Sequence, residues 1–389
     1  MRLKITISCL LRAFVPLWLF LFLHNNSFSQ VTIILKNASD FTPEIQNSIY
    51  IAGNFNQWNP GDLELKFKNE NGKIALTFIP DSGITYLEFK FTRGTWETGE
   101  VYKDGGYRTN RSYFYTPGML LELTVESFQD IAPTKVIEPN KDVIQFQIYS
   151  PELKREKNIR IYLPCDYKTS NKNYPVLYML DGQNLFDDVY AYGGEWGVDE
   201  NMDSICNLGW TTSIIVGIDH AGEKRTTEYS PWFINEEYGG GEGDEFGSFL
   251  TNTLKPKIDS MYRTKPQREF TSVAGSSMGG LMSLYIVLNH NDIFSKGGIF
   301  SPAFWTSKEN FSNAENFVGK LPTKLFFICG AMEGNDAQYM RDMEAMYDIL
   351  LNKKLANLQM RLVVESTGTH SEWFWRSEFF EVYKWLIIE

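Results

Sequence analysis

The sequence predicts an α/β protein with two domains, a small β-sandwich followed by a larger domain built on a mostly parallel sheet. The chain has 389 residues, more than one small domain needs. Residues 31–128 contain short β-rich runs separated by turn residues. Beyond residue 142, apolar strand-like runs alternate with helix-like segments. This alternation is typical of a parallel sheet covered by helices on both faces.

The composition narrows the class of protein. Hydrophobic residues make up 43% of the chain and charged residues 22%, ordinary values for a soluble globular protein and unlike a disordered one. The 37 Lys and Arg against 48 Asp and Glu give a formal charge of −11, so we expect no nucleic-acid partner. No cysteine or histidine spacing fits a zinc site and no phosphate-binding loop is present, so we expect neither metal nor cofactor.

Residues 1–29 have the order typical of a secretory signal peptide. Three basic residues come first, a nearly unbroken apolar run follows at 13–23, and polar and small residues lead to Ser29. We predict cleavage after Ser29, a secreted or periplasmic protein, and no stable membrane span in the mature chain. Counting the apolar run back to Ile5 leaves an uncleaved N-terminal anchor as the alternative. Cleavage leaves Cys165, Cys206 and Cys329, so at most one disulfide can form.

The β-sandwich is expected over residues 30–128. A linker is predicted at 129–142, which carries two prolines and no clear period, and the α/β domain at 143–389. The expected strands of the sandwich are Val31–Leu35, Ser48–Ala52, Lys73–Phe78, Tyr86–Phe91 and Leu120–Val125. Those of the second domain are Ile159–Leu163, Val176–Leu180, Ser213–Ile218, Thr271–Ala274, Lys324–Cys329 and Met360–Val364.

A Gly-x-Ser-x-Gly motif at 275–279 lies between a predicted strand and a predicted helix. This context is typical of a nucleophile elbow, in which a serine on a tight turn exposes its hydroxyl. Glycines two positions before and after the serine are needed because side chains there would leave no room. Ser277 is therefore the candidate nucleophile, whereas Ser276 occupies the variable position.

A serine nucleophile of this kind needs a histidine base, and the chain order serine, acid, histidine favours His370. His370 follows the strand Met360–Val364 and precedes a terminal helix, so its imidazole could accept the serine proton. His220 precedes the serine in the chain and His290 closes the helix after the elbow, so both are less suited. A structural core histidine is the alternative role for His370.

The triad acid is expected in the loop that follows the strand Lys324–Cys329. Glu333 comes sooner after the strand and is favoured, while Asp336 stays open as the alternative. An oxyanion hole needs two backbone N–H groups, one from the residue after the nucleophile and one from an early strand-to-helix loop. These donors are expected to be Met278 and Gln183.

With these residues placed, residues 141–389 resemble the putative esterase family, which includes feruloyl, acetylxylan and enterochelin-type siderophore esterases and S-formylglutathione hydrolase. The resemblance implies an α/β-hydrolase fold and ester hydrolysis through an acyl-enzyme. It also implies that Trp196, Arg225, Glu228, Tyr229 and Trp305 line the substrate pocket, the alternative being core packing and a structural ion pair. The segments that carry it are Leu180–Phe186, Glu195–Asp199, Ile215–Ile218, Arg225 with Glu228–Pro231, Tyr262–Thr264, Gly275–Gly280 and Ser301–Trp305.

The N-terminal domain resembles starch- and glycogen-binding modules, which are immunoglobulin-like β-sandwiches. The match rests on Ile51–Pro60, Leu87–Phe91, Trp96-Glu97 and Asn110-Arg111. The resemblance implies α-glucan binding with Trp96 stacked on glucose and Trp58 packed internally. The strand Lys73–Phe78 lacks the second tryptophan that starch binders usually place there, so a purely structural sandwich is the alternative.

Together these features predict a secreted or periplasmic serine esterase that cleaves an ester attached to a carbohydrate. The same catalytic domain would serve a siderophore esterase, which is the second hypothesis. A third, from a different class, is a non-catalytic glycan-binding protein whose hydrolase domain is a relic. The presence of a serine, an acid and a histidine in the expected order favours an enzyme.

Overall fold

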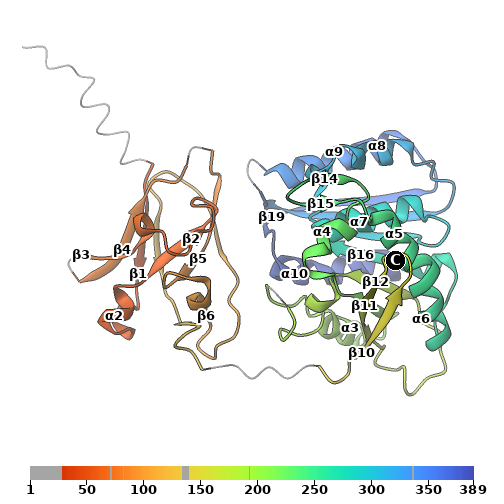
Figure 1. The fold of residues 1–389 in the computed structure, drawn as a ribbon, viewed down its shortest axis with the longest axis horizontal. Coiled ribbons are helices and arrows are strands. Elements are labelled where there is room, and N and C mark those ends of the chain that lie inside the picture. The colour runs from red at the N-terminus through yellow and green to blue at the C-terminus, as the bar shows by residue number, and fades with distance from the viewer. Residues whose placement is uncertain (1–28, 71, 82, 134–139, 192, 335–336) are drawn as a thin grey trace, which may run out of the picture. The chain divides into compact units, whose positions relative to one another are not determined.

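The computed structural model describes residues 29–70, 72–81, 83–133, 140–191, 193–334 and 337–389 (Figure 1). The predicted signal peptide, apart from Ser29, and residues 134–139 of the predicted linker lie outside these residues. The chain divides into two compact units, Met1–Val101 with Tyr113–Ala132 and Tyr102–Ser112 with Pro133–Glu389. In the described ranges, no helix combines the length and apolar character needed to cross a bilayer.

The first unit is β-rich, as predicted. Its larger sheet has the order β3-β4-β1-β8 and a second has the order β2-β5-β7, while β6 pairs with β9. Ile33, Leu76 and Phe89 from the two larger sheets belong to one buried cluster, so these sheets share a core. The elements are β1 (Val31–Leu35), α2 (Pro43–Gln46), β2 (Tyr50–Gly53), β3 (Lys68–Glu70), β4 (Lys73–Phe78), β5 (Tyr86–Thr92), β6 (Glu100–Val101), β7 (Arg111–Phe114), β8 (Leu120–Leu123) and β9 (Ser127–Phe128).

The second unit is built on an eight-stranded sheet with the order β10-β11-β13-β12-β16-β17-β18-β19. The pairs β10–β11 and β11–β13 are antiparallel, and all later pairs are parallel. The strands are β10 (Ile144–Ser150), β11 (Arg155–Tyr162), β12 (Val176–Leu180), β13 (Ile214–Ile218), β16 (Thr271–Ser276), β17 (Lys296–Phe300), β18 (Thr323–Met332) and β19 (Leu358–Thr369).

Helices cover both faces of this sheet (Figure 1). One face packs against α5 to α9 and the other against α3 and α10, because successive strand residues such as Leu177 and Tyr178 enter different buried clusters. The helices are α3 (Val198–Asn207), α4 (Arg225–Glu228), α5 (Gly243–Ser248), α6 (Lys255–Met261), α7 (Met278–Asn289), α8 (Glu309–Asn316), α9 (Gln338–Asn352) and α10 (Glu372–Tyr383), and β14 (Phe233–Asn235) with β15 (Gly239–Gly240) forms a hairpin.

Two strands run further than the sequence pattern predicts. β18 continues to Met332 and β19 to Thr369, and these two residues are paired across the parallel strands. The two chain segments that leave these strands therefore start side by side. Cys165 and Cys206 form a disulfide, and Cys329 is free and buried in β18.

Candidate active site

Ser277 occupies a strained turn between β16 and α7. Its backbone has φ +57° and ψ −121°, outside the regions that most L-residues adopt. Two backbone hydrogen bonds hold the turn: Ser277 donates to the carbonyl of Phe300 at 3.0 Å, and Ala303 donates to the carbonyl of Ser277 at 3.0 Å. The strain and its restraints are those expected of a nucleophile elbow.

The motif glycines are required by close packing around this turn. A Cβ on Gly275 would lie 2.8 Å from the carbonyl oxygen of Gly279. A Cβ on Gly279 would lie 3.2 Å from Oδ2 of Asp181. The local sequence therefore dictates the sharp bend, because larger residues would push strand and helix apart.

His370 and Glu333 meet where β19 and β18 end. Nδ1 of His370 lies 3.0 Å from Oε2 of Glu333, the geometry of an imidazole held by a carboxylate. This contact leaves Nε2 as the nitrogen available for other chemistry. Each residue directly follows its strand, so the register of β18 with β19 sets the pairing. The alternative acid, Asp336, lies outside the described residues.

Glu333 is 1% exposed and its other oxygen is fully engaged. Oε1 accepts hydrogen bonds from the Gly330 N–H at 2.7 Å and from the Ser301 hydroxyl at 2.7 Å. The indole N–H of Trp375 in turn donates to Ser301 Oγ at 2.8 Å. Such a chain of donors fixes the carboxylate orientation that His370 meets.

Tyr339, at the start of α9, contacts both His370 and Ser277. Its ring centroid lies 4.5 Å from that of His370. Burial raises the pKa of Tyr339, and hydrogen bonding to the side chains of Trp305 and Ser277 opposes that shift. The Tyr339 hydroxyl therefore lies near Ser277 and Trp305, and its ring lies against His370. No sequence motif marks Tyr339, because it belongs to an ordinary amphipathic helix.

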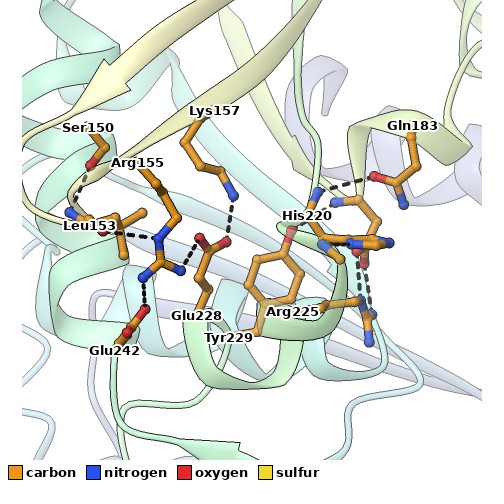
Figure 2. A network of polar contacts seen from close by, with 12 residues as sticks. Ser150, Leu153, Arg155, Lys157, Gln183, His220, Arg225, Glu228, Tyr229 and Glu242 are labelled. Atoms are coloured by element: carbon orange, nitrogen blue, oxygen red, sulfur yellow. Dashed lines mark hydrogen bonds and ion pairs between the residues drawn. The ribbon is translucent and has the colours of Figure 1, made fainter.

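The turn after β12 carries the predicted oxyanion donor Gln183. Its Oε1 accepts from the backbone N–H of His220 at 3.2 Å, which joins the turn to the segment after β13 (Figure 2). Gly182 packs against β13, because a Cβ there would lie 2.7 Å from the carbonyl carbon of Gly217. The other predicted donor, Met278, is the first residue of α7, where backbone N–H groups have no partner within the helix.

An ion pair between Asp181 and Arg225 braces the same turn. Arg225 donates from Nε and Nη2 to the two carboxylate oxygens of Asp181 at 2.7 and 2.8 Å (Figure 2). The backbone N–H of Asp181 donates to the hydroxyl of Tyr229 at 3.1 Å. Asp181 itself adopts a left-handed conformation with φ +57°. Arg225 keeps 27% of its side chain exposed, so one edge can reach solvent.

Three of the five predicted pocket residues lie in the core, the alternative that the sequence left open. Tyr229 and Glu228 are fully buried. Trp196 is 2% exposed, with its ring 5.0 Å from that of Phe300. Glu228 carries a structural ion pair instead of facing a substrate, accepting from Arg155 at 3.0 Å and from Lys157 (Figure 2).

The other two predicted pocket residues, Arg225 and Trp305, retain exposed surface. Trp305 is 41% exposed and its ring lies edge-on to Tyr238, 6.2 Å between centroids. Their contact with a substrate stays a prediction. In the first unit, Trp96 is 44% exposed and its ring lies 6.2 Å from that of the half-buried Trp58.

The remaining histidines have structural surroundings. His220 accepts a hydrogen bond on Nδ1 from the Gly222 N–H at 2.9 Å, and burial lowers its pKa. His290 ends α7 and presses against α5, since a Cβ on Gly247 would lie 2.5 Å from its Nε2. Burial also lowers the pKa of His290. Among the described residues, neither ring has a carboxylate hydrogen-bonded to it as His370 does.

The strand order, the antiparallel second strand and the elbow after β16 define an α/β-hydrolase. Residues 150–386 match the family described as "Putative esterase", and the chain belongs to that family. It is accordingly a carboxylic ester hydrolase of the serine esterase type, as the sequence resemblance implied.

The chain is also similar in sequence to curated proteins and in fold to solved structures. The chain is 23% identical over 242 residues to the uncharacterized protein YbbA of Bacillus subtilis, covering 59% of this chain and 92% of that protein. It is 26% identical over 172 residues to an endo-1,4-beta-xylanase/feruloyl esterase of Xylanibacter ruminicola, covering 43% of this chain and only 22% of that protein. The enterobactin esterase FES of Shigella flexneri has the same fold, with a TM-score of 0.59 at 14% identity over 91% of this chain and 90% of that one.

Proposed function

We propose that this protein is an exported serine esterase that uses Ser277, His370 and Glu333 to cleave a carboxylic ester attached to a carbohydrate. The observation that carries the proposal is the 3.0 Å contact between His370 and Glu333 beside a strained serine turn. A structural histidine would need neither a strained serine nor a fully hydrogen-bonded buried carboxylate nearby.

The proposed reaction follows from the positions of these groups. Nε2 of His370 takes the proton of the Ser277 hydroxyl as Oγ forms a bond to the ester carbonyl carbon. The carbonyl oxygen becomes an oxyanion that accepts from the backbone N–H groups of Met278 and Gln183. Collapse breaks the bond to the alkoxy oxygen, which takes the proton from His370 and leaves as the alcohol. Water, deprotonated by His370, then attacks the acyl carbon; the bond to Ser277 Oγ breaks, Oγ takes the proton back from His370, and the carboxylic acid leaves.

The surroundings of Ser277 favour an acyl group with an apolar, flat body. Tyr339 and Trp305 present aromatic surface next to the serine, and Trp305 is partly exposed. Aromatic rings of this kind pack well against a phenolic acyl group. The feruloyl esterase named among the relatives supports a phenolic ester of a plant polysaccharide.

Export is supported by the disulfide between Cys165 and Cys206, because such bonds persist in oxidising compartments. The charged, apolar and small-residue order of residues 1–29 supports the same location. We infer that the first unit docks α-glucan or another glycan through Trp96, whose exposed indole offers a stacking face. Replacing Trp96 with Ala should abolish retention on insoluble glycan, whereas replacing Phe114, 50% exposed in the same unit, should not.

The test of the catalytic assignment is a matched pair of serine variants. Ser277→Ala should lower kcat on short-chain p-nitrophenyl esters by at least about 10⁴-fold, because the nucleophile is lost. Ser283→Ala, in α7 six residues after Ser277, removes a buried hydroxyl that has no hydrogen-bond partner in the described residues and should leave kcat unchanged. Equal activity of the two variants would show that Ser277 is not the nucleophile.

The siderophore-esterase hypothesis has one observation in its favour. The enterobactin esterase structure covers more of this chain than residues 133–389, so the likeness reaches into the β-rich unit. The two hypotheses separate by substrate: faster hydrolysis of feruloylated or acetylated oligosaccharides supports the carbohydrate ester, and faster hydrolysis of a catecholate trilactone supports the siderophore. An intact, folded protein that hydrolyses no ester would favour the glycan-binding relic.

A further inference from the structure

A second group of carboxylates, from buried to exposed, lies outside the candidate triad. Glu195, Asp199 and Glu200 each offer a carboxylate oxygen, and these oxygens lie within 4.8 Å of one another. Glu195 belongs to the loop before α3, and the other two lie in the first turn of α3. This cluster was not predicted from the sequence, because the expectation of no metal rested on cysteine and histidine spacing.

Two of these carboxylates are buried with hydrogen-bonding capacity unused. Asp199 is 6% exposed, and its Oδ1 has no hydrogen-bond partner among the described residues. Oε2 of Glu195 is likewise buried without a partner there. Buried polar atoms in folded proteins nearly always have a partner, so an unpaired pair of oxygens in one cluster indicates a missing ligand.

The described protein groups around the cluster leave these two oxygens without a donor. Arg376 on α10 donates to Oε1 of Glu195 at 3.1 Å and reaches Glu200 only at 3.9 Å. Asn140 donates to Oδ2 of Asp199, the other oxygen of that carboxylate. With one guanidinium against three carboxylates, the cluster has a formal charge of −2 when fully ionised, which one divalent cation would neutralise.

We infer that Glu195, Asp199 and Glu200 bind a calcium ion. Calcium takes oxygen ligands at about 2.3–2.6 Å and accepts carboxylates in flexible geometry, so oxygens within 4.8 Å of one another can share one such ion. The absence of nitrogen and sulfur donors disfavours zinc. Glu200, 55% exposed, gives the ion a route from solvent. The ion would tie the loop of Glu195 to the first turn of α3.

The direct test is the melting temperature of the full chain after dialysis against EDTA. Calcium at up to about 10 mM should raise it by about 5 °C, the effect of a ligand present far above its Kd. Glu200→Gln changes an exposed ligand without threatening the fold and should abolish most of the rise, as should Asp199→Asn. Glu236→Gln changes an exposed carboxylate elsewhere and should keep the full rise.

A spectroscopic test uses terbium as a calcium substitute. The buried indole of Trp196 adjoins Glu195 in the chain, so excitation of tryptophan should sensitise terbium emission that added calcium displaces. Glu200→Gln should lose this emission. A melting temperature unmoved by calcium together with emission no stronger than that of free terbium would overturn the proposal. Equal responses in wild type and Glu200→Gln would also overturn it, because the ion would then bind elsewhere.

Discussion

Two carboxylate sites in the second unit differ in whether their buried oxygens have hydrogen-bond partners. At the end of β18, Glu333 accepts from Gly330 and Ser301 and contacts His370, so both of its oxygens are engaged. Near the start of α3, Glu195 and Asp199 each keep a buried oxygen that has no hydrogen-bond partner among the described residues. The first site is complete with protein donors alone, whereas the second is incomplete in the described chain.

The electrostatics of the incomplete site reflect this difference. Burial raises the pKa of Glu195 to about 7 and that of Asp199 to about 8, with further contributions from neighbouring Glu200. Charged carboxylates are costly where donors are few, so the cluster holds protons at a pH where ordinary carboxyl groups have lost them. Hydrogen-bond donors hold the Glu333 carboxylate in one orientation. A buried carboxylate without donors can instead bind a proton or a metal ion.

The largest expected effect is on activity and comes from replacing Glu333, the carboxylate whose two oxygens are both engaged. Glu333→Gln keeps the shape but removes the charge that orients His370, so kcat/KM should fall about 10³- to 10⁴-fold. Steady-state hydrolysis of p-nitrophenyl acetate measures it. The matched control is Glu344→Gln, an exposed carboxylate on α9, which should retain wild-type activity. If kcat/KM of folded Glu333→Gln fell less than tenfold, Glu333 would not be the triad acid and Asp336 would be the remaining candidate.

A third buried carboxylate, Glu228, extends the comparison to stability (Figure 2). It pairs with Lys157, and both side chains are almost fully buried. Burial lowers the pKa of Lys157, and the attraction of Glu228 opposes this shift. Glu228→Ala leaves a buried ammonium unpaired, so the free energy of unfolding should fall by about 3–5 kcal/mol.

Denaturant unfolding of the second unit measures that loss. The control is Glu381→Ala, which breaks an exposed pair with Lys384 and should cost less than about 1 kcal/mol. If Glu228→Ala were no more costly than Glu381→Ala, the buried pair would not be a structural requirement.

The incomplete site should make stability depend on pH. Because the folded-state pKa values of Glu195 and Asp199 are raised, the folded chain binds more protons than the unfolded chain between about pH 4 and pH 8. In EDTA this contribution to stability is present at low pH and is lost as pH rises through 7 to 8. Asp188, Glu200 and Arg376 are the charged groups that act on Glu195.

Melting temperatures at about pH 5.5 and pH 8, with calcium and with EDTA, test this expectation. Protons compete with the ion, so calcium should raise the melting temperature by several degrees more at the higher pH. Asp199→Asn should flatten the dependence on pH in EDTA. A calcium effect that is equal at both pH values would contradict the link between the ion and these carboxyl groups.

The sequence was informative where structure is local. The elbow follows from glycines packed against their own neighbours, and the position of His370 follows from a strand and a helix adjacent in the chain. The alternation of apolar runs predicted the α/β sheet, because burial on both faces leaves that pattern. The roles of Ser277, His370 and Glu333 in catalysis remain predictions.

The sequence was less informative where partners are distant. Whether Trp196 or Tyr229 faces a pocket or the core depends on how loops fold back onto the sheet. The pair Asp181 and Arg225 joins residues 44 positions apart. Tyr339 and His370 come from different elements and meet only in the folded chain. None of these contacts leaves a periodic pattern, so a resemblance could mark the segments but not the direction of their side chains.

The smallest expected effect comes from removing one of the hydrogen-bond donors of Glu333. Ser301→Ala removes one of the two donors to Oε1 of Glu333 and leaves the Trp375 indole N–H without its acceptor. The loss of such hydrogen bonds should cost about 1–3 kcal/mol of stability. It should lower kcat by about tenfold, since Glu333 keeps its charge and its contact with His370.

The comparison between kcat and KM distinguishes positioning from general damage. Ser301 acts through Glu333 and should change kcat with little change in KM, and Ser301→Thr, which keeps a hydroxyl, should recover part of the rate. Ser283→Ala again supplies the control for removing a buried serine hydroxyl. Unchanged kcat in Ser301→Ala would mean that the Gly330 N–H alone suffices to hold Glu333. The two carboxylate sites would then differ through the backbone donor Gly330, and the hydrogen bonds from Trp375 to Ser301 and from Ser301 to Glu333 would not matter for the rate.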